Sequence, residues 1–173
     1  MQDLSFRSLE AAVIRRGVPR PVTLGGMARG GEYTNLALML SDQCPWRTVF
    51  RVDGEMVCDL RGSVLDQVEE SAGIVSAIRD GMPTGSSNLA SSVFRELVLN
   101  AACHRSYCSP EPTFVDVGPS EITVSSPGEP VRLGAEFRLR TRNPALTETL
   151  LAMGYRDRGV RSAAGAFIQY TDS

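Results

Sequence analysis

Apolar residues recur every three or four positions in several stretches of the chain, which is the spacing of an amphipathic helix. Ser5 and Thr34 are suitable N-caps for the first two of these stretches, and Gly17 is a suitable stop for the first. Pro144 suits the first turn of the last stretch. The helices predicted in this way cover residues 6–16, 33–41, 63–79, 93–107 and 143–153.

Short segments rich in β-branched residues predict strands between the helices. Asp53 and Gly54 separate two of these segments and suit a tight reverse turn, so the two form a hairpin. Residues 166–170 are either a last strand or part of a disordered tail. The pattern predicts an α+β fold, a two-layer α/β sandwich with helices on one face of a mixed β-sheet and a short helical N-terminal lead-in. The predicted strand pairs are 48–52 with 55–60 and 113–117 with 121–125.

The composition is that of an ordinary globular chain. The 173 residues are 42% hydrophobic and 22% charged, which is enough to build one domain core. The net charge of −2 argues against direct binding of a nucleic-acid backbone. No stretch approaches the about 20 apolar residues needed to cross a bilayer, and no secretion signal is visible, so we expect a cytoplasmic protein with no membrane partner.

Residues 93–107, with the sequence VFRELVLNAACHRSY, contain the most distinctive chemistry. At about 100° per residue, Glu96 and Asn100 lie on one face of the helix, flanked by apolar side chains. Ser91 and Arg95 lie on the roughly opposite side, which is the expected solvent face. Burial of a lone carboxylate costs several kcal/mol. The pattern therefore implies a ligand, a metal or an internal partner for these two side chains.

The simplest internal partner is a local one. Glu96 would then pair with Arg95 or Arg105, and Asn100 would bond to a loop. Spacing alone does not decide between this alternative and a ligand site.

Four segments of the chain occur in the same order as in a known family. They read GEYTNLALMLSDQCP, FRELVLNAACHRSY, ITVSSPGEP and RNPALTETLLAMG, and they begin at Gly31, Phe94, Ile122 and Arg142. Together they resemble the C-terminal domain of RecG-like or Schlafen-type bacterial transcriptional regulators, a divergent ATPase domain of the GHKL (Bergerat-fold) type. The resemblance implies a helical lead-in or linker over residues 1–30 and a divergent GHKL ATPase-like domain over 31–173. It also implies that DNA is bound only through a separate N-terminal domain.

In that wider superfamily, the helix glutamate polarises the attacking water and the asparagine four residues later coordinates magnesium. The resemblance therefore gives Glu96 a catalytic role and makes Asn100 a ligand of Mg²⁺ and ATP. A carboxylate and an amide oxygen suit these roles chemically. The resemblance also implies a glycine turn that approaches the nucleotide, supplied here by Ser125, Ser126, Pro127 and Gly128.

His104 is the only histidine, and its HRSY setting resembles the family's H-R-D-Y. It either stands at the helix C-terminus, where the helix dipole stabilises its cation, or contacts a phosphate of the nucleotide. Zinc is a weaker alternative. Cys103 and His104 are adjacent and point in different directions on a helix, and Cys108 has no C-x-x-C partner.

The chain departs from the family pattern at three places. Ser125 and Ser126 replace the aspartate that reads the adenine amino group, and only Gly159 and Gly165 remain of a closing G-T-G-I motif. No long lid segment is found over residues 131–142. We therefore expect an ATP-binding regulatory domain with weak or no hydrolysis. The alternative is a degenerate module that binds no ligand and acts in protein interaction or as a homodimer.

Overall fold

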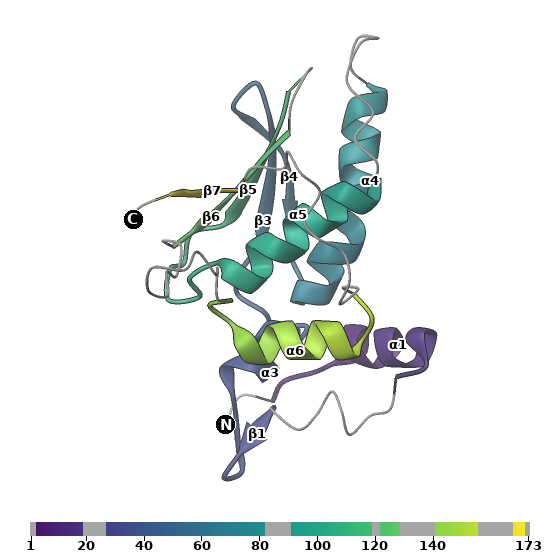
Figure 1. The fold of residues 1–173 in the computed structure, drawn as a ribbon, viewed down its shortest axis with the longest axis vertical. Helices are drawn as coiled ribbons and strands as arrows, with labels where there is room; N and C mark the ends of the chain where they lie inside the picture. Colours follow the sequence, from purple (N-terminus) through teal and green to yellow (C-terminus); the bar gives the residue numbers. More distant parts are fainter. Residues whose placement is uncertain are drawn as a thin grey trace, which may run out of the picture.

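A computed structural model describes residues 3–18, 27–81, 91–118, 122–128, 141–155 and 168–171 (Figure 1). The side chains of 91–93 and 168–171 lie outside this description. The helices are α1 (Arg7–Arg16), α3 (Asn35–Leu40), α4 (Val64–Asp80), α5 (Ser91–His104) and α6 (Pro144–Ala152). The strands are β1 (Ala28–Arg29), β2 (Glu32–Tyr33), β3 (Thr48–Val52), β4 (Glu55–Leu60), β5 (Thr113–Val117), β6 (Ile122–Pro127) and β7 (Ile168–Thr171).

The main sheet is mixed. Its order is β4-β3-β5-β6-β7, with β3 parallel to β5 and β6 parallel to β7, while the other neighbours are antiparallel. β1 and β2 form a separate small hairpin within the region predicted only as a linker and the start of a helix. β7 supports the strand alternative for the C-terminal segment, although residues 166 and 167 of that prediction lie outside the described residues.

The β3–β4 hairpin forms where the Asp-Gly pair predicted it. Asp53 has φ 51° and Gly54 has φ 83°, the left-handed pair that matches the twist of a two-residue hairpin turn. The register shifts between Phe50 and Arg51, so one extra residue is accommodated in the ladder.

Alternating burial shows which face of the sheet is covered. In β5, Val115 is 0% and Val117 is 2% exposed, whereas Phe114 and Asp116 on the other face are half-buried. Arg51 joins Asp116 there through two hydrogen bonds of 2.7 Å. α5 crosses the front of the sheet with α4 beside it (Figure 1). Helices on one face of a mixed sheet confirm the predicted α+β class.

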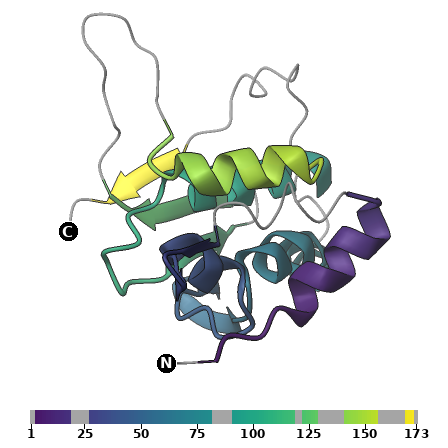
Figure 2. The same ribbon diagram turned by 90° about the horizontal axis from the view of Figure 1, so that it is seen from below.

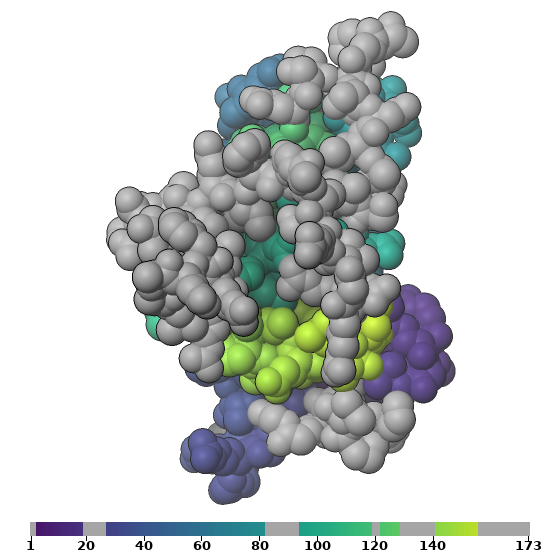
Figure 3. Space-filling view, in the orientation of Figure 1, coloured from purple at the N-terminus to yellow at the C-terminus, as the bar shows by residue number. Residues whose placement is uncertain are grey.

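The remaining helices pack below this layer. α6 lies against α5, as the view from below shows (Figure 2). α1 lies beside α6 on the surface (Figure 3), where Arg16 Nη1 donates to the carbonyl oxygen of Gly154 at 3.3 Å. Leu9 and Val13 of α1 are buried in the same apolar cluster as Leu65 of α4. The N-terminal helix is thus part of the core. None of the helices in the described ranges is both long and apolar enough to span a membrane.

Helix ends agree with local sequence signals in most cases. Thr34 accepts a hydrogen bond from the backbone N–H of Ala37 at 3.4 Å. Ser63 and Asp66 form a capping box, with each side chain accepting from the other's backbone N–H. Asn143 precedes Pro144 at the start of α6, also as predicted.

The predicted cap of α1 was wrong. Ser5 does not cap the helix. The first backbone N–H groups, those of Arg7 and Ser8, donate to the carboxylate of Asp42 at 3.3 Å each, and Ser5 Oγ donates to the same carboxylate at 2.8 Å. An ionised carboxylate near a helix N-terminus is a stronger acceptor than a serine hydroxyl. The distant Asp42 therefore replaces the local cap.

Candidate functional site

Glu96 on α5 has one carboxylate oxygen that no described residue bonds to. The helix is buried on most sides, with Leu97 6% and Leu99 1% exposed, while Arg95 is exposed. Glu96 is half-buried, and its Oε1 is inaccessible to solvent and has no hydrogen-bond partner in the described part of the chain. Neither Arg95 nor Arg105 forms an ion pair with it there, so the local pairing considered from the sequence was wrong for Glu96.

Asn100 lies one turn further along α5 and is 7% exposed. Its burial agrees with the predicted inward face of the helix. The side chain already takes part in an interaction within the protein. Ala102, on the roughly opposite side of the helix, is half-buried, because α4 and the sheet cover that face.

The strand facing α5 corrects the predicted glycine turn. Ser125, Ser126 and Pro127 lie within β6 and not in a turn. Ser125 pairs with Phe114 of β5, and Ser126 pairs in parallel with residue 170 of β7. This second pairing lengthens the strand, and no local pattern indicated it. The Ser126 side chain is 1% exposed, and its Oγ has no hydrogen-bond partner among the described residues.

Gly128 alone keeps the predicted turn role. Its φ is +116°, a region that favours glycine. A Cβ at this position would lie 3.1 Å from both the Cβ and the backbone N of Ser106. The Ser106 N–H donates to the carbonyl oxygen of Pro127 at 2.6 Å. The end of β6 is therefore held tightly against the segment that follows α5.

Residues just before α6 also bond to the C-terminal end of α5. Asn143 Nδ2 donates to the carbonyl oxygens of Cys103 at 3.1 Å and Arg105 at 3.0 Å. Thr141 Oγ1 donates to the carbonyl oxygen of Cys103 at 2.9 Å. These bonds satisfy carbonyl groups that a helix C-terminus leaves without partners. The sequence analysis did not single out Asn143 for this function.

His104 is the last residue of α5 and is half-buried, so it occupies the predicted helix C-terminus. A contact with a phosphate stays a prediction. Cys44 and Cys103 are buried, and none of Cys44, Cys58, Cys103 and Cys108 forms a disulfide. The described residues contain no group of three or more His, Cys, Asp or Glu side chains placed to hold a metal ion.

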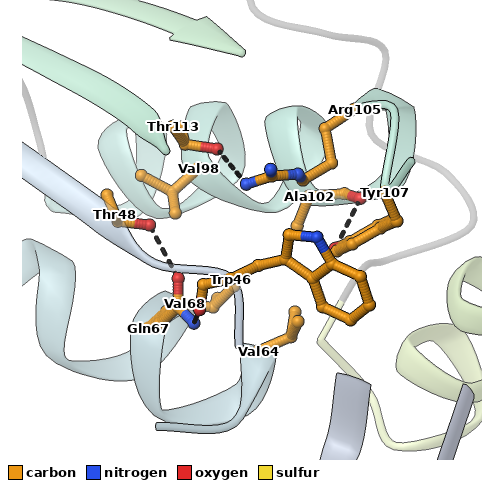
Figure 4. A pocket seen from close by; sticks show the side chains of 10 residues that line it. All are labelled: Trp46, Thr48, Val64, Gln67, Val68, Val98, Ala102, Arg105, Tyr107 and Thr113. Carbon is orange, nitrogen blue, oxygen red and sulfur yellow. Dashed lines mark hydrogen bonds between the residues drawn. The ribbon is translucent and has the colours of Figure 1, made fainter. Parts of the chain in front are cut away.

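A cavity lies on the other face of α5. Val98, Ala102 and Arg105 line it from the helix, and Trp46, Gln67 and Thr113 line it from across (Figure 4). Val98 and Arg105 are roughly 160–180° round the helix from Glu96, at about 100° per residue. The cavity offers about 20 Å³ to the centre of a water molecule. It is far too small for a nucleotide and is not the space predicted between Glu96 and Ser126.

Several predicted features fall outside the described residues. They are the absent lid over 131–140 and the motif remnants Gly159 and Gly165. Arg105 is the clearest residue that the sequence analysis passed over as a site residue. Its position on the same helix face as Val98 was the available signal for its burial.

Comparisons with known proteins bear on the fold. Neither a protein-family model nor a curated protein matches the sequence. The structure is similar to the crystal structure of the DIP2311 protein from Corynebacterium diphtheriae, with a TM-score of 0.67 and 17% sequence identity. The match covers 91% of this chain and 39% of that chain. Such a likeness shows a shared fold, and this chain spans well under half the length of that protein.

Proposed function

We propose that this chain is an ATP-binding regulatory domain of the divergent GHKL type, belonging to a RecG-like or Schlafen-type bacterial transcriptional regulator. One observation carries the proposal. The buried Oε1 of Glu96 has no protein partner in the described residues, and it lies one helical turn from the buried Asn100. Leaving such an oxygen unsatisfied costs about 1–3 kcal/mol, which a bound ligand would offset.

The side chains present fit a magnesium nucleotide. Glu96 would accept a hydrogen bond from a water beside the terminal phosphate, and the amide oxygen of Asn100 would ligate Mg²⁺. Another buried oxygen without a described partner, Ser126 Oγ, lies on β6, which is in contact with α5. A hydroxyl can accept from, or donate to, the polar edge of a base. Gly128 would allow close approach of the backbone, and His104 would contact a phosphate.

The proposed domain hydrolyses ATP weakly or not at all. Ser125 and Ser126 are neutral, so the base is held without the charge-assisted bond that an aspartate would provide. A nucleotide that binds without turnover can act as a signal, and a separate N-terminal domain would transmit it to DNA. The net charge of −2 favours such a division between the nucleotide-binding domain and a DNA-binding domain.

Isothermal titration with ATP and MgCl₂ tests the proposal. We expect saturable binding to the wild type and at least tenfold weaker binding to Asn100→Ala. Asn35→Ala is the matched control, because Asn35 is exposed on α3 and should leave the affinity unchanged. Absence of heat with the wild type, or equal affinities in wild type and Asn100→Ala, would rule out the nucleotide site.

One observation favours the second candidate, a dimerisation module. β4 is an edge strand of the five-stranded sheet, and its Met56 and Val57 side chains are 63% and 52% exposed. Exposed apolar edge strands tend to pair with another chain. Sedimentation at several concentrations distinguishes the two functions. Self-association without nucleotide binding, abolished by Val57→Lys, would support the module.

A further inference from the structure

Arg105 is a buried cation that lacks a carboxylate partner. The residue is 3% exposed. Its Nη1 donates to Thr113 Oγ1 at 3.3 Å, and its Nη2 donates to the carbonyl oxygens of Glu111 at 2.6 Å and Ser109 at 3.4 Å. Its Nε has no hydrogen-bond partner, and no carboxylate in the described ranges pairs with it. The guanidinium is therefore hydrogen-bonded in part and lies 5.0 Å from the centre of the Tyr107 ring, but no carboxylate in the described ranges balances its charge.

The titratable neighbours of Arg105 do not supply that counter-charge. Burial raises the pKa of the Cys44 thiol to about 11, even though the guanidinium favours its thiolate. Burial also raises the pKa of Tyr107 above its ordinary value, and its hydroxyl donates to the carbonyl oxygen of Ala102 at 3.0 Å. Both groups are thus neutral at physiological pH. Burying an uncompensated charge costs several kcal/mol.

The polar atoms around the cavity leave donors available. Gln67 uses its amide nitrogen on the carbonyl oxygens of Trp46 at 2.8 Å and Gly62 at 2.9 Å, and its oxygen accepts from Thr48 at 2.9 Å. Thr113 accepts from Arg105, which leaves its own hydroxyl proton free to donate. Arg105 and Thr113, which both line the cavity, therefore have an N–H and an O–H without a described acceptor, and no carboxylate is among the lining residues (Figure 4).

The size of the cavity limits what it can hold. About 20 Å³ is open to the centre of a water-sized sphere, against the about 10–15 Å³ that one water requires. A single ion somewhat larger than water fits. Trp46 and Tyr107 stand edge to face with ring centroids 4.8 Å apart, and both are half-buried beside the cavity. These half-buried rings beside the cavity lower the local dielectric and so strengthen electrostatic interactions within it.

We propose that this cavity binds one monovalent inorganic anion of halide size, chloride under cellular conditions, as the counter-ion of Arg105. The Nε–H of Arg105 and the hydroxyl of Thr113 donate to it. The site is on the face of α5 opposite Glu96 and does not depend on the proposed nucleotide site. The anion stabilises the link between the end of α5 and the segment that leads into β5.

Crystals of the wild-type chain grown in sodium bromide provide the direct test. We expect an anomalous peak in the cavity within hydrogen-bond distance of Arg105 Nε, replaced by a chloride-sized peak in sodium chloride. An ordinary water without anomalous signal, or an empty cavity, would overturn the proposal. This result does not depend on any variant folding.

Thermal unfolding gives the test in solution. At constant ionic strength, replacing gluconate by chloride at about ten times its dissociation constant should raise the midpoint by about 3–6 °C. Thr113→Val keeps Arg105 and should weaken the chloride response at least threefold, and Arg105→Met should abolish it. Arg51→Met is the control, because Arg51 already pairs with Asp116 on the far face of the sheet, and it should keep the full response. Equal responses in all four proteins would contradict a specific site.

Discussion

Replacement of Glu96 by methionine should make the protein without ligand more stable. Methionine is unbranched and similar in length, so it fills the space of the glutamate without an oxygen that needs a partner. Oε1 of Glu96 is inaccessible to solvent and has no hydrogen-bond partner among the described residues. An unsatisfied buried polar atom costs about 1–3 kcal/mol. Because the side chain is only half-buried, we expect a gain near the lower limit, about 1 kcal/mol.

The matched control is the same substitution at Glu69 in α4. That carboxylate is bonded to Arg15, Arg16 and the hydroxyl of Tyr155. Glu69→Met would remove these bonds and leave the Tyr155 hydroxyl without its acceptor. We expect a loss of about 1–3 kcal/mol. The two substitutions therefore have opposite expected signs although the chemical change is identical.

Urea unfolding followed by far-UV circular dichroism measures both effects. A gain of about 1 kcal/mol for Glu96→Met corresponds to about 2–4 °C in the thermal midpoint of a chain of this size. Nucleotide must be absent, because a ligand would stabilise the wild type selectively. A Glu96→Met protein that is as stable as the wild type, or less stable, would show that the carboxylate has a partner in solution and would remove the main support for a ligand site.

Two further predictions concern helix capping and the end of β6. Burial raises the pKa of Asp42, but hydrogen bonds from Arg7, Ser5 and the backbone outweigh it and lower the pKa from 3.8 to about 2. The stabilisation is therefore complete above about pH 4 and is lost as the pH falls through 2, so Asp42→Asn should cost about 1–2 kcal/mol at pH 6 and little at pH 2 in urea unfolding. A difference that does not change with pH would contradict this capping role. Gly128→Ala should cost about 1–3 kcal/mol by the same assay, because φ is +116° and the new Cβ would meet Ser106 at 3.1 Å. Gly154→Ala, with φ +72° but nothing within 4 Å, should cost less, and equal losses would show that crowding at Ser106 has no effect.

Features that depend on neighbouring residues were predicted correctly. The Asp53-Gly54 turn, the cap at Thr34 and the start of α6 all follow from bonds within a few positions. The inward face of α5 followed from helical spacing, which placed Asn100 inside. These signals also sufficed for the α+β class, because amphipathic helices need a sheet face to cover.

Features that depend on distant partners were missed or wrong. The cap of α1 comes from Asp42 and not from Ser5, and Ser126 and Pro127 lie in a strand because β7 pairs beside them. No pattern within β6 indicates that pairing. The burial of Arg105 likewise results from α4, β3 and β5 closing around it. Short-range sequence patterns therefore predicted the inward face of α5 correctly, but they predicted a turn where Ser126 and Pro127 lie in the facing strand.

The parallel pairing of β6 with β7 has a consequence for the synthesis of the protein. A ribosome adds about 5–20 residues per second, so β6 leaves the exit tunnel seconds before residues 168–171 leave it. During that interval one edge of β6 has no neighbouring strand and can join the nascent chain of an adjacent ribosome. The half of the sheet that contains Ser126 is completed after translation of β7, and chaperones that shield strand edges should raise the yield of folded protein.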